Sequence, residues 1–394
     1  MSNLRFGTFL APIHSAGEHP TVALQRDLEL VERLDRLNYD EVWVGEHHSA
    51  GSEIIGHPEI FIAAAAERTK RIRFGTGVTS VPYHNPLWSA ERIVLLDHLT
   101  RGRIMMGAGP GSLPTDGAML GLTPTDTREL LGVNLDIIIR LLAGESVTEK
   151  TLTHNLVDAR LHYLPFTQPR FPISVAAVAS PTGPRLAGQY GVGLMSIGAT
   201  LTKDGFDALA FHWDVVEERA AHFGRPAPSR DDWRLVGAMH IAETREQAIR
   251  DVEYGIVEWF RYFQKVAAFP QFALDGSDIE EMVAFINEGG FGVIGTPDDA
   301  AAQVERLVKQ SGGFGAFLLQ AHDWANPAAT ERSFELLAQR VFPRFQGGPT
   351  SFTDQSLNAK QRATDTRDEH FATHAAGIAH MTEKYRTEVA GGSA

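Results

Sequence analysis

The feature that most constrains the fold of this chain is a repeat of short apolar runs about thirty residues apart. Apolar runs begin near residues 41, 72 and 103, and each is followed by a segment with the residue spacing of an amphipathic helix. A strand, a crossover helix and a second parallel strand together need roughly 30 residues. The repeat therefore predicts parallel strands joined by helices, which is the pattern of α/β proteins.

Continuing this count along the chain gives eight strands. They are predicted at residues 4–10, 41–45, 72–78, 103–107, 173–178, 193–197, 235–241 and 315–320. Helices are predicted at residues 21–37, 58–68, 86–99, 127–142, 245–258, 297–309 and 328–345. Eight strands are the number in a closed (β/α)8, or TIM, barrel. The alternative, an open doubly wound sheet, requires two halves and a switch point, and the sequence shows neither.

Two stretches interrupt the rhythm of strands and helices. Residues 146–172, after the fourth strand, are predicted to form an insertion that contains a short pair of strands. Residues 259–290, after the seventh strand, are rich in aromatic side chains, including Phe269 and Phe272. They predict either a lid or substrate wall, or an inserted helical hairpin that packs on the barrel. We therefore expect a barrel domain over residues 1–348 with these two insertions.

The composition becomes polar after Gly347 and the two residues that follow it. Residues 349–394 are therefore expected to form an appended tail, with a helix over 362–386 and the remainder disordered. One interpretation of this tail is a helical arm that reaches a partner subunit.

Charge and composition exclude several classes of function. The net charge of -13 argues against binding to nucleic acid or to an anionic membrane surface. The absence of cysteine excludes disulfides, thiolate metal sites and thiol nucleophiles. We find no signal-peptide pattern at the N-terminus and no apolar stretch long enough to span a bilayer. The expected location is therefore cytoplasmic.

The second predicted strand leads into the most chemically suggestive stretch, DEVWVGEHHS at residues 40–49. A short apolar run ends at a glycine and is followed by Glu46, His47 and His48. Polar side chains at the carboxyl end of a barrel strand indicate a site at the barrel mouth. Adjacent strand residues point to opposite faces, so this histidine pair is not expected to bind one metal ion. The alternative interpretation is a surface turn with two solvated histidines.

Four stretches together resemble a known family. They are DEVWVGEHH at 40–48, RFGTGVTSVPYHNP at 73–86, DHLTRGRIMMGAGPG at 97–111 and GTPDDAAAQVERL at 295–307. In combination they resemble the bacterial luciferase-like flavin monooxygenases, especially the limonene monooxygenase-like branch, over roughly residues 4–345. GAGPG alone would be only a weak glycine cluster. The resemblance implies an FMN- or deazaflavin-binding (β/α)8 barrel, usually dimeric, and this fold agrees with the strand count.

Carried over position by position, the resemblance implies a set of site residues. His47 matches the histidine that lies by the flavin and assists the oxygen chemistry, and Glu46 lies at the same mouth. A non-proline cis peptide is implied between Gly77 and Val78, under the flavin ring. The cofactor-binding positions implied by the resemblance are Glu46, Gly77, Val78, Gly107, Ala108, Gly109, Arg128, Ala176, Ala177, Val178, Ala179, Ser180 and Thr182. The predicted substrate pocket is lined by His48, Tyr83, His84, Trp88 and Trp324.

The phosphate site departs from the family pattern at one position. Pro110 stands where a family arginine binds phosphate, whereas a second family arginine is matched by Arg128. Ser180 and Thr182 precede a helix, and hydroxyls with free N–H groups there form a reasonable phosphate seat. An ordinary helix cap would have the same geometry.

The implied activity is that of a two-component monooxygenase. No strand–GxGxxG–helix fingerprint is present, so a separate flavin reductase is expected to supply reduced FMN. O2 would add at the flavin C4a to give a (hydro)peroxide that oxygenates a small hydrophobic organic substrate. His47 would exchange a proton there, and no metal is expected. The alternatives are a deazaflavin-dependent oxidoreductase, a flavin-cleaving lyase and a non-catalytic flavin carrier. A homodimer is the expected assembly.

Overall fold

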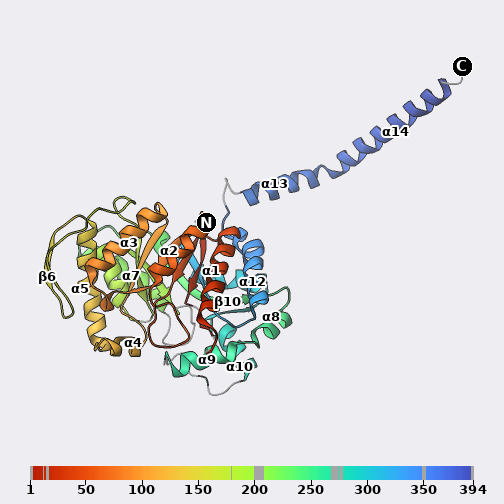
Figure 1. Ribbon diagram of the computed structural model, residues 1–394. Coiled ribbons are helices and arrows are strands. Elements are labelled where there is room, and N and C mark those ends of the chain that lie inside the picture. The colour runs from red at the N-terminus through yellow and green to blue at the C-terminus, as the bar shows by residue number, and fades with distance from the viewer. Residues whose placement is uncertain are drawn as a thin grey trace. The chain divides into compact units, whose positions relative to one another are not determined.

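The computed structural model describes residues 3–11, 13–14, 17–178, 180–198, 208–267, 274, 278–347 and 352–391 (Figure 1). The chain divides into two compact units. The larger unit is Leu4–Arg344, and the smaller one consists of Phe345–Ala394 together with the first three residues. Ala179, Phe269 and Phe272 lie outside the described residues.

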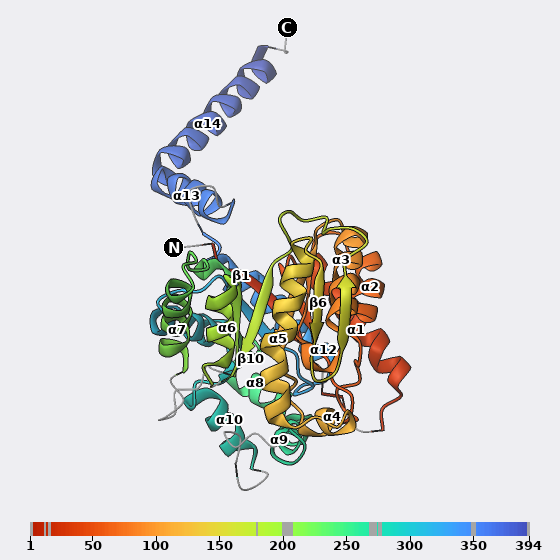
Figure 2. The same cartoon turned by 90° about the vertical axis from the view of Figure 1, so that its left-hand side faces the viewer.

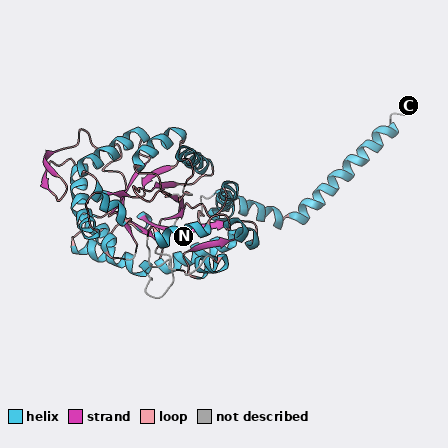
Figure 3. Cartoon of the chain, turned by 60° about the horizontal axis from the view of Figure 1, so that its bottom comes forward, coloured by secondary structure: helices cyan, strands magenta, loops and turns pink. Residues whose placement is uncertain are grey.

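The larger unit is the predicted (β/α)8 barrel. Its parallel strands are β1 (Arg5–Leu10), β2 (Glu41–Val44), β3 (Arg73–Thr76), β5 (Ile104–Gly109), β8 (Ile173–Ala177), β9 (Gly193–Ile197), β10 (Trp233–Ile241) and β12 (Ala316–Gln320). The sheet closes because β10 pairs with both β9 and β12. Figure 3 shows the helices arranged around the strands. All eight strand predictions are therefore confirmed.

Large apolar side chains from several strands fill the barrel interior. Phe9, Trp43, Met105, Met195 and Leu318 belong to one buried cluster. The backbone accommodates the indole of Trp43 because its neighbour on β3 is Gly75, where a Cβ atom would lie 2.3 Å from the ring. The strands are buried along most of their length, as expected for parallel strands covered by helices.

The outer helices largely follow the predictions, apart from those that begin at residues 114 and 208, which were not predicted. They are α1 (Pro20–Arg36), α2 (Pro58–Arg68), α3 (Pro86–Thr100), α4 (Pro114–Met119), α5 (Pro124–Leu142), α6 (Thr182–Tyr190), α7 (Ala208–His222), α11 (Pro297–Ser311) and α12 (Pro327–Leu336). Several begin with proline, whose missing N–H costs nothing in the first turn. α5 starts earlier than predicted because Thr123 and Asp126 form a capping box around its first turn. The single predicted helix 328–345 is α12 followed by a π-turn, Leu337–Val341, and a 3-10 turn, Phe342–Arg344.

The first insertion contains the predicted strand pair, β6 (Val147–Lys150) and β7 (Asn155–Ala159), which are antiparallel. Short elements missed by the sequence analysis are β4 (Thr79–Ser80) and the 3-10 turns Val81–Tyr83 and Arg230–Asp232.

The second insertion corrects one prediction. The expected single helix 245–258 is two helices, α8 (Arg245–Val252) and α9 (Ile256–Lys265). The break falls at Gly255, where a Cβ atom would lie 1.9 Å from the carbonyl oxygen of Asp323. α9 packs against α10 (Ile279–Glu288), as the helical hairpin interpretation expects, and a substrate wall in this insertion stays a prediction. An unpredicted strand, β11 (Gly292–Gly295), pairs with the end of β10.

The smaller unit contains α13 (Phe352–Asp365) and α14 (Arg367–Gly391). The tail helix predicted over 362–386 is therefore two helices that meet at Thr366, and more of the tail is helical than expected. No helix in the described part of the chain is long and apolar enough to cross a membrane. Whether the tail reaches a partner subunit stays a prediction.

Candidate active site

His47 follows β2 and lies between two carboxylates. Its Nε2 is 3.3 Å from Oε2 of Glu53, and its Nδ1 is 3.4 Å from Oδ2 of Asp116. Glu53 belongs to the loop between β2 and α2, and Asp116 belongs to α4. The phenol of Tyr262, on α9, donates a hydrogen bond to Glu53. α4 and α9 lie at the same end of the barrel in both views (Figures 1 and 2), so these contacts join the two helices across His47.

The charges around His47 favour its protonated form. Burial alone would lower the pKa of His47, but the charge of Glu53 and the contact with Asp116 raise it above 6.5. Burial raises the pKa of Glu53 despite the nearby imidazole. Burial and the charge of Glu53 also raise the pKa of Tyr262, so this phenol stays protonated and donates. The two facing carboxyl groups therefore favour a proton on His47.

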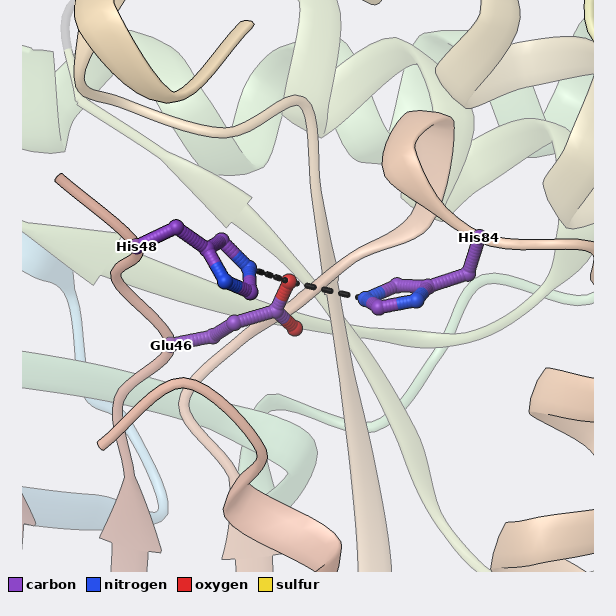
Figure 4. Close-up of side chains that lie close together, drawn as sticks. All are labelled: Glu46, His48 and His84. Carbon is purple, nitrogen blue, oxygen red and sulfur yellow. Dashed lines mark hydrogen bonds and ion pairs between the residues drawn. The ribbon is translucent and has the colours of Figure 1, made fainter. Parts of the chain in front are cut away.

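A second set of contacts centres on Glu46, whose side chain is 0% exposed. Its Oε1 accepts hydrogen bonds from Nε2 of His48, at 3.0 Å, and from Nε2 of His84, at 2.8 Å (Figure 4). Its Oε2 accepts the backbone N–H of Ser80 at 3.0 Å. Burial acts to raise the pKa of Glu46, but these bonds outweigh it and lower the pKa to about 2. Glu46 is therefore a buried carboxylate that stays ionised.

The two adjacent histidines have different partners, as strand alternation predicted. His47 faces Glu53 and Asp116, whereas His48 faces Glu46. The interpretation of this stretch as a solvated turn is wrong, because the side chain of His47 is only 14% exposed and that of Glu46 is fully buried.

Glycines allow close packing at the ends of β3 and β5. The Gly77–Val78 peptide bond is cis, as expected. A Cβ atom at Gly107 would lie 2.2 Å from the carbonyl oxygen of Thr76, and one at Gly109 would lie 2.4 Å from Cγ2 of Val78. Packing between these two strands thus explains both glycines. Contact of Gly77, Val78, Gly107, Ala108 and Gly109 with a flavin stays a prediction.

The predicted phosphate seat lies where β8 runs into α6. Ala176 and Ala177 end the strand, and α6 begins at Thr182. Within the described helix α6, Pro181 at the N-cap makes no side-chain hydrogen bond, and the first turn carries no acid. Its first N–H groups are therefore oriented for an anion. Ser180 is exposed and Val178 is 36% exposed, so both are open to a ligand.

Arg128, the predicted phosphate arginine, is exposed on α5. Its Nη1 donates to the carbonyl oxygen of Pro124 at 2.7 Å. A contact with phosphate would require this guanidinium to leave its own helix, and the contact stays a prediction.

The predicted pocket residues fall into two groups. His48, Tyr83 and His84 come together: the rings of His48 and Tyr83 are 6.1 Å apart, and both histidines bind Glu46. Trp88 is 61% exposed on α3. Trp324 is fully buried and stacks on His322 with ring centroids 3.9 Å apart. A part for these two tryptophans in a substrate pocket stays a prediction.

Sequence reasoning missed Glu53, Asp116 and Tyr262. Glu53 is only six residues after His47 but lies in no motif, Asp116 is far from it in sequence, and Tyr262 lies within the aromatic-rich stretch 259–290. The one available signal was Asp116 in the first turn of a helix that starts with proline, directly after the GAGPG stretch.

Comparisons with known proteins agree with this architecture. The family model of luciferase-like monooxygenases matches residues 4–314. Limonene 1,2-monooxygenase from Rhodococcus erythropolis is 48% identical over 363 residues, covering 91% of this chain and 92% of that protein. The 4-hydroxyprotoasukamycin monooxygenase of Streptomyces nodosus subsp. asukaensis is 44% identical over 356 residues, covering 88% of this chain and 94% of that protein.

Solved structures show the same barrel. The oxygenating constituent of 3,6-diketocamphane monooxygenase from Pseudomonas putida, a type II Baeyer-Villiger monooxygenase in complex with FMN, is 25% identical with a TM-score of 0.70. The match covers 87% of this chain and 99% of that one. The monooxygenase RslO1 from Streptomyces bottropensis has a TM-score of 0.74 at 22% identity, covering 87% of this chain and 100% of its own. From the family match and the identity to the first relatives, this chain belongs to the luciferase-like monooxygenases.

Proposed function

We propose that this protein is the oxygenating component of a two-component monooxygenase that uses reduced FMN and O2 to oxygenate a small hydrophobic organic compound. The strongest support for this proposal is the 48% identity to limonene 1,2-monooxygenase, which covers 91% of the chain. The FMN complex of the diketocamphane enzyme favours FMN over a deazaflavin. An F420-dependent secondary alcohol dehydrogenase and a riboflavin lyase are only 17% and 16% identical. They share the fold alone.

The residues present fit a flavin at the barrel mouth. The ends of β5 and β8 carry small side chains, Gly107 to Gly109 and Ala176 with Ala177, so that a flat ring would meet backbone there. The uncapped start of α6 would provide N–H groups for a phosphate, and Arg128 lies on α5, which contacts α6. When bound, reduced FMN supplies the electrons that activate O2; the protein positions it and excludes water.

His47 is the residue of this chain that would handle the proton. A protonated His47 would direct one N–H from Nε2 toward Glu53 and the other from Nδ1 toward Asp116. A cationic imidazole stabilises negative charge that develops on reduced oxygen and donates a proton to it. Asp116 fixes the ring orientation through Nδ1, and Glu53 with Tyr262 covers the opposite side. We therefore assign His47 the role of acid rather than base at neutral pH.

The second insertion supports a hydrophobic substrate. Trp259, Phe260 and Phe263 on α9 belong to a buried apolar cluster with Trp324. Tyr262, on the same helix, contacts Glu53 beside His47. An apolar helix is thus placed next to the acid–base residues. The relatives' names, limonene and diketocamphane, denote small cyclic hydrophobic compounds, which suit such a wall. A homodimer and a transient flavin reductase belong to the same proposal.

The two-component scheme is tested by its reductant. The purified protein alone should oxidise NADH or NADPH very slowly, and addition of FMN with an unrelated flavin reductase should give turnover. Fast NADPH oxidation without a reductase would contradict the scheme. Parallel titration with FMN and with a deazaflavin cofactor, followed by absorbance, separates the two cofactor assignments.

A further inference from the structure

Three side chains at the barrel mouth converge on one point. Nε2 of His48, Nε2 of His84 and Oε1 of Glu46 all lie within 4.8 Å of one another (Figure 4). They come from separate segments, since Glu46 and His48 follow β2 while His84 follows the turn Val81–Tyr83. Glu46 and His48 are two positions apart, so they share a side of the extended chain. Two imidazoles and one carboxylate are a donor set typical of first-row transition metals.

The spacing of these atoms suits an ion. Ligands bound at about 2.1 Å lie roughly 3.0 Å apart at right angles and roughly 3.4 Å apart at tetrahedral angles. The two oxygen–nitrogen separations here are 3.0 Å and 2.8 Å. The Ser80 N–H holds the second oxygen of Glu46, which fixes the carboxylate in the way that outer hydrogen bonds orient metal ligands.

A third histidine stands beside this set. The ring of His57, just before α2, is 5.9 Å from the ring of His48 and 6.4 Å from that of His84. A modest movement of its exposed side chain would bring a fourth nitrogen to the same point. The mouth therefore gathers three imidazole rings, and two of them contact one buried carboxylate.

A second group in the described chain provides an internal comparison. His14, Glu18 and Asp323 also bring three ligand atoms within 4.8 Å. There, however, the guanidinium of Arg26 lies 2.9 Å from Nδ1 of His14 and 3.3 Å from Oδ2 of Asp323, and it also binds Glu18. In that group, the guanidinium of the arginine thus occupies the position that a metal ion would take. The Glu46 group receives hydrogen bonds from its own histidines instead.

We propose that Glu46, His48 and His84 form a binding site for a divalent transition-metal ion such as Zn²⁺ or Co²⁺ at the mouth of the barrel. Three protein ligands leave at least one coordination position for water or for a ligand atom. Binding would replace the two hydrogen bonds to Glu46 and would immobilise His48, the neighbour of His47. The proposal does not rest on the flavin chemistry proposed above, although Glu46 is also a predicted flavin contact and both histidines are also predicted to line the substrate pocket. In the sequence, the pair that suggests metal ligands is His47 with His48, and because adjacent residues point to opposite faces, no metal is expected from that pair.

The chain is well suited to a direct test because it contains no cysteine. Tight binding of a thiophilic ion therefore cannot come from thiolates. The clearest competing pair is His370 and His374, four residues apart on α14, which lie on one face of that helix. A test must separate this pair from the mouth.

The experiment titrates Co²⁺ into the full chain, without an affinity tag and after removal of metal by a chelator, and follows the visible absorption of the bound ion. Competition with Zn²⁺ then gives the Zn²⁺ affinity. We expect one saturable site per chain. Glu46→Gln, His84→Gln and His48→Ala should each weaken binding by at least about 10-fold. His374→Ala and Glu18→Gln serve as controls and should leave it unchanged.

Denaturation midpoints measured in chelator show whether each variant is folded, and His48→Ala, whose side chain is 25% exposed, is the variant least disruptive to the core. Loss of binding in His374→Ala, or undiminished binding in folded Glu46→Gln, His84→Gln and His48→Ala, would overturn the proposal. So would the absence of saturable binding to the wild type below about 1 mM, since three preformed ligands should bind more tightly than that.

Discussion

Nε2 of His47 lies 3.3 Å from Oε2 of Glu53, although one residue follows a barrel strand and the other lies in a loop with no recognisable motif. With Asp116 on the opposite nitrogen, this contact raises the pKa of His47 above its usual value and favours the protonated imidazole. The relationship changes the role expected of this histidine, because a solvated imidazole near neutral pH would serve equally as acid or base. The predictions below test that role and the proposed cofactor site.

The first prediction concerns His47 itself. His47→Ala should lower the product formed per reduced flavin by roughly 10²- to 10⁴-fold, as for a lost acid–base group, while more hydrogen peroxide is released. Flavin affinity should change little. Product and peroxide are measured together under a fixed supply of reduced FMN. His48→Ala is the comparison and should have a milder effect; a His47→Ala enzyme that couples as well as wild type would refute the assignment.

The second prediction concerns pH. The pKa of His47 is raised above 6.5 in the folded protein, so its charged form and the stability it contributes are fully present below 6.5 and are lost as the pH rises through the folded-state pKa. Activity that needs the imidazolium should fall over the same pH range. This fall forms the alkaline limb of the pH–activity profile. Asp116→Asn removes one facing charge and should move that limb to lower pH.

A matched control is Ser49→Ala, which removes a hydroxyl that donates to Asp116 but keeps the carboxylate. Its alkaline limb should stay close to that of wild type. An unchanged limb in Asp116→Asn would mean that the facing charge does not set the protonation of His47.

The third prediction concerns the contact between the insertion and the mouth. Tyr262→Phe removes the phenol that donates to Glu53, and this bond is among the effects that lower the pKa of Glu53. Without it the pKa of Glu53 should rise further, so the acidic limb of the activity profile should move to higher pH. The aromatic ring remains, and the denaturation midpoint should change little. If Tyr262 had only a structural role, Tyr262→Phe would instead lower the stability of the protein and leave its pH–activity profile unchanged.

The fourth prediction concerns Arg128. If its guanidinium turns from Pro124 to the FMN phosphate, it would form a charge-assisted pair worth about 1.5–3 kcal/mol. Arg128→Ala should then weaken FMN binding by roughly 10- to 150-fold and leave riboflavin, which lacks the phosphate, almost unaffected. Equal losses for both flavins would indicate an effect through the fold, and no loss for either would place the phosphate elsewhere.

The barrel was predictable because its strands are buried on both faces and therefore appear as apolar runs at a regular interval. The break between α8 and α9 was not, since the constraint on Gly255 comes from the backbone of Asp323, far along the chain. β11 was missed because its four residues follow an aromatic insertion and lie outside the regular repeat.

The residues of the candidate site likewise divide into those that the sequence predicts and those that only the structure reveals. Glu46, His47 and His48 could be found because they directly follow a strand whose end must face the mouth. Glu53, Asp116 and Tyr262 come from a loop and two helices, and only the folded chain brings them to His47. Local sequence carries no signal for such contacts, so the electrostatic state of His47 could be determined only from the structure.

The central claim is that this chain transfers one atom of O2 to a small hydrophobic compound. The most direct measurement supplies reduced FMN through an unrelated reductase, under isotope-labelled O2, with limonene and related cyclic terpenes and ketones as candidate substrates. Mass spectrometry should find one labelled oxygen atom in a product that forms only when the protein, reduced FMN and O2 are all present. Product whose added oxygen comes from water, or turnover that yields hydrogen peroxide alone across the whole substrate set, would contradict the account.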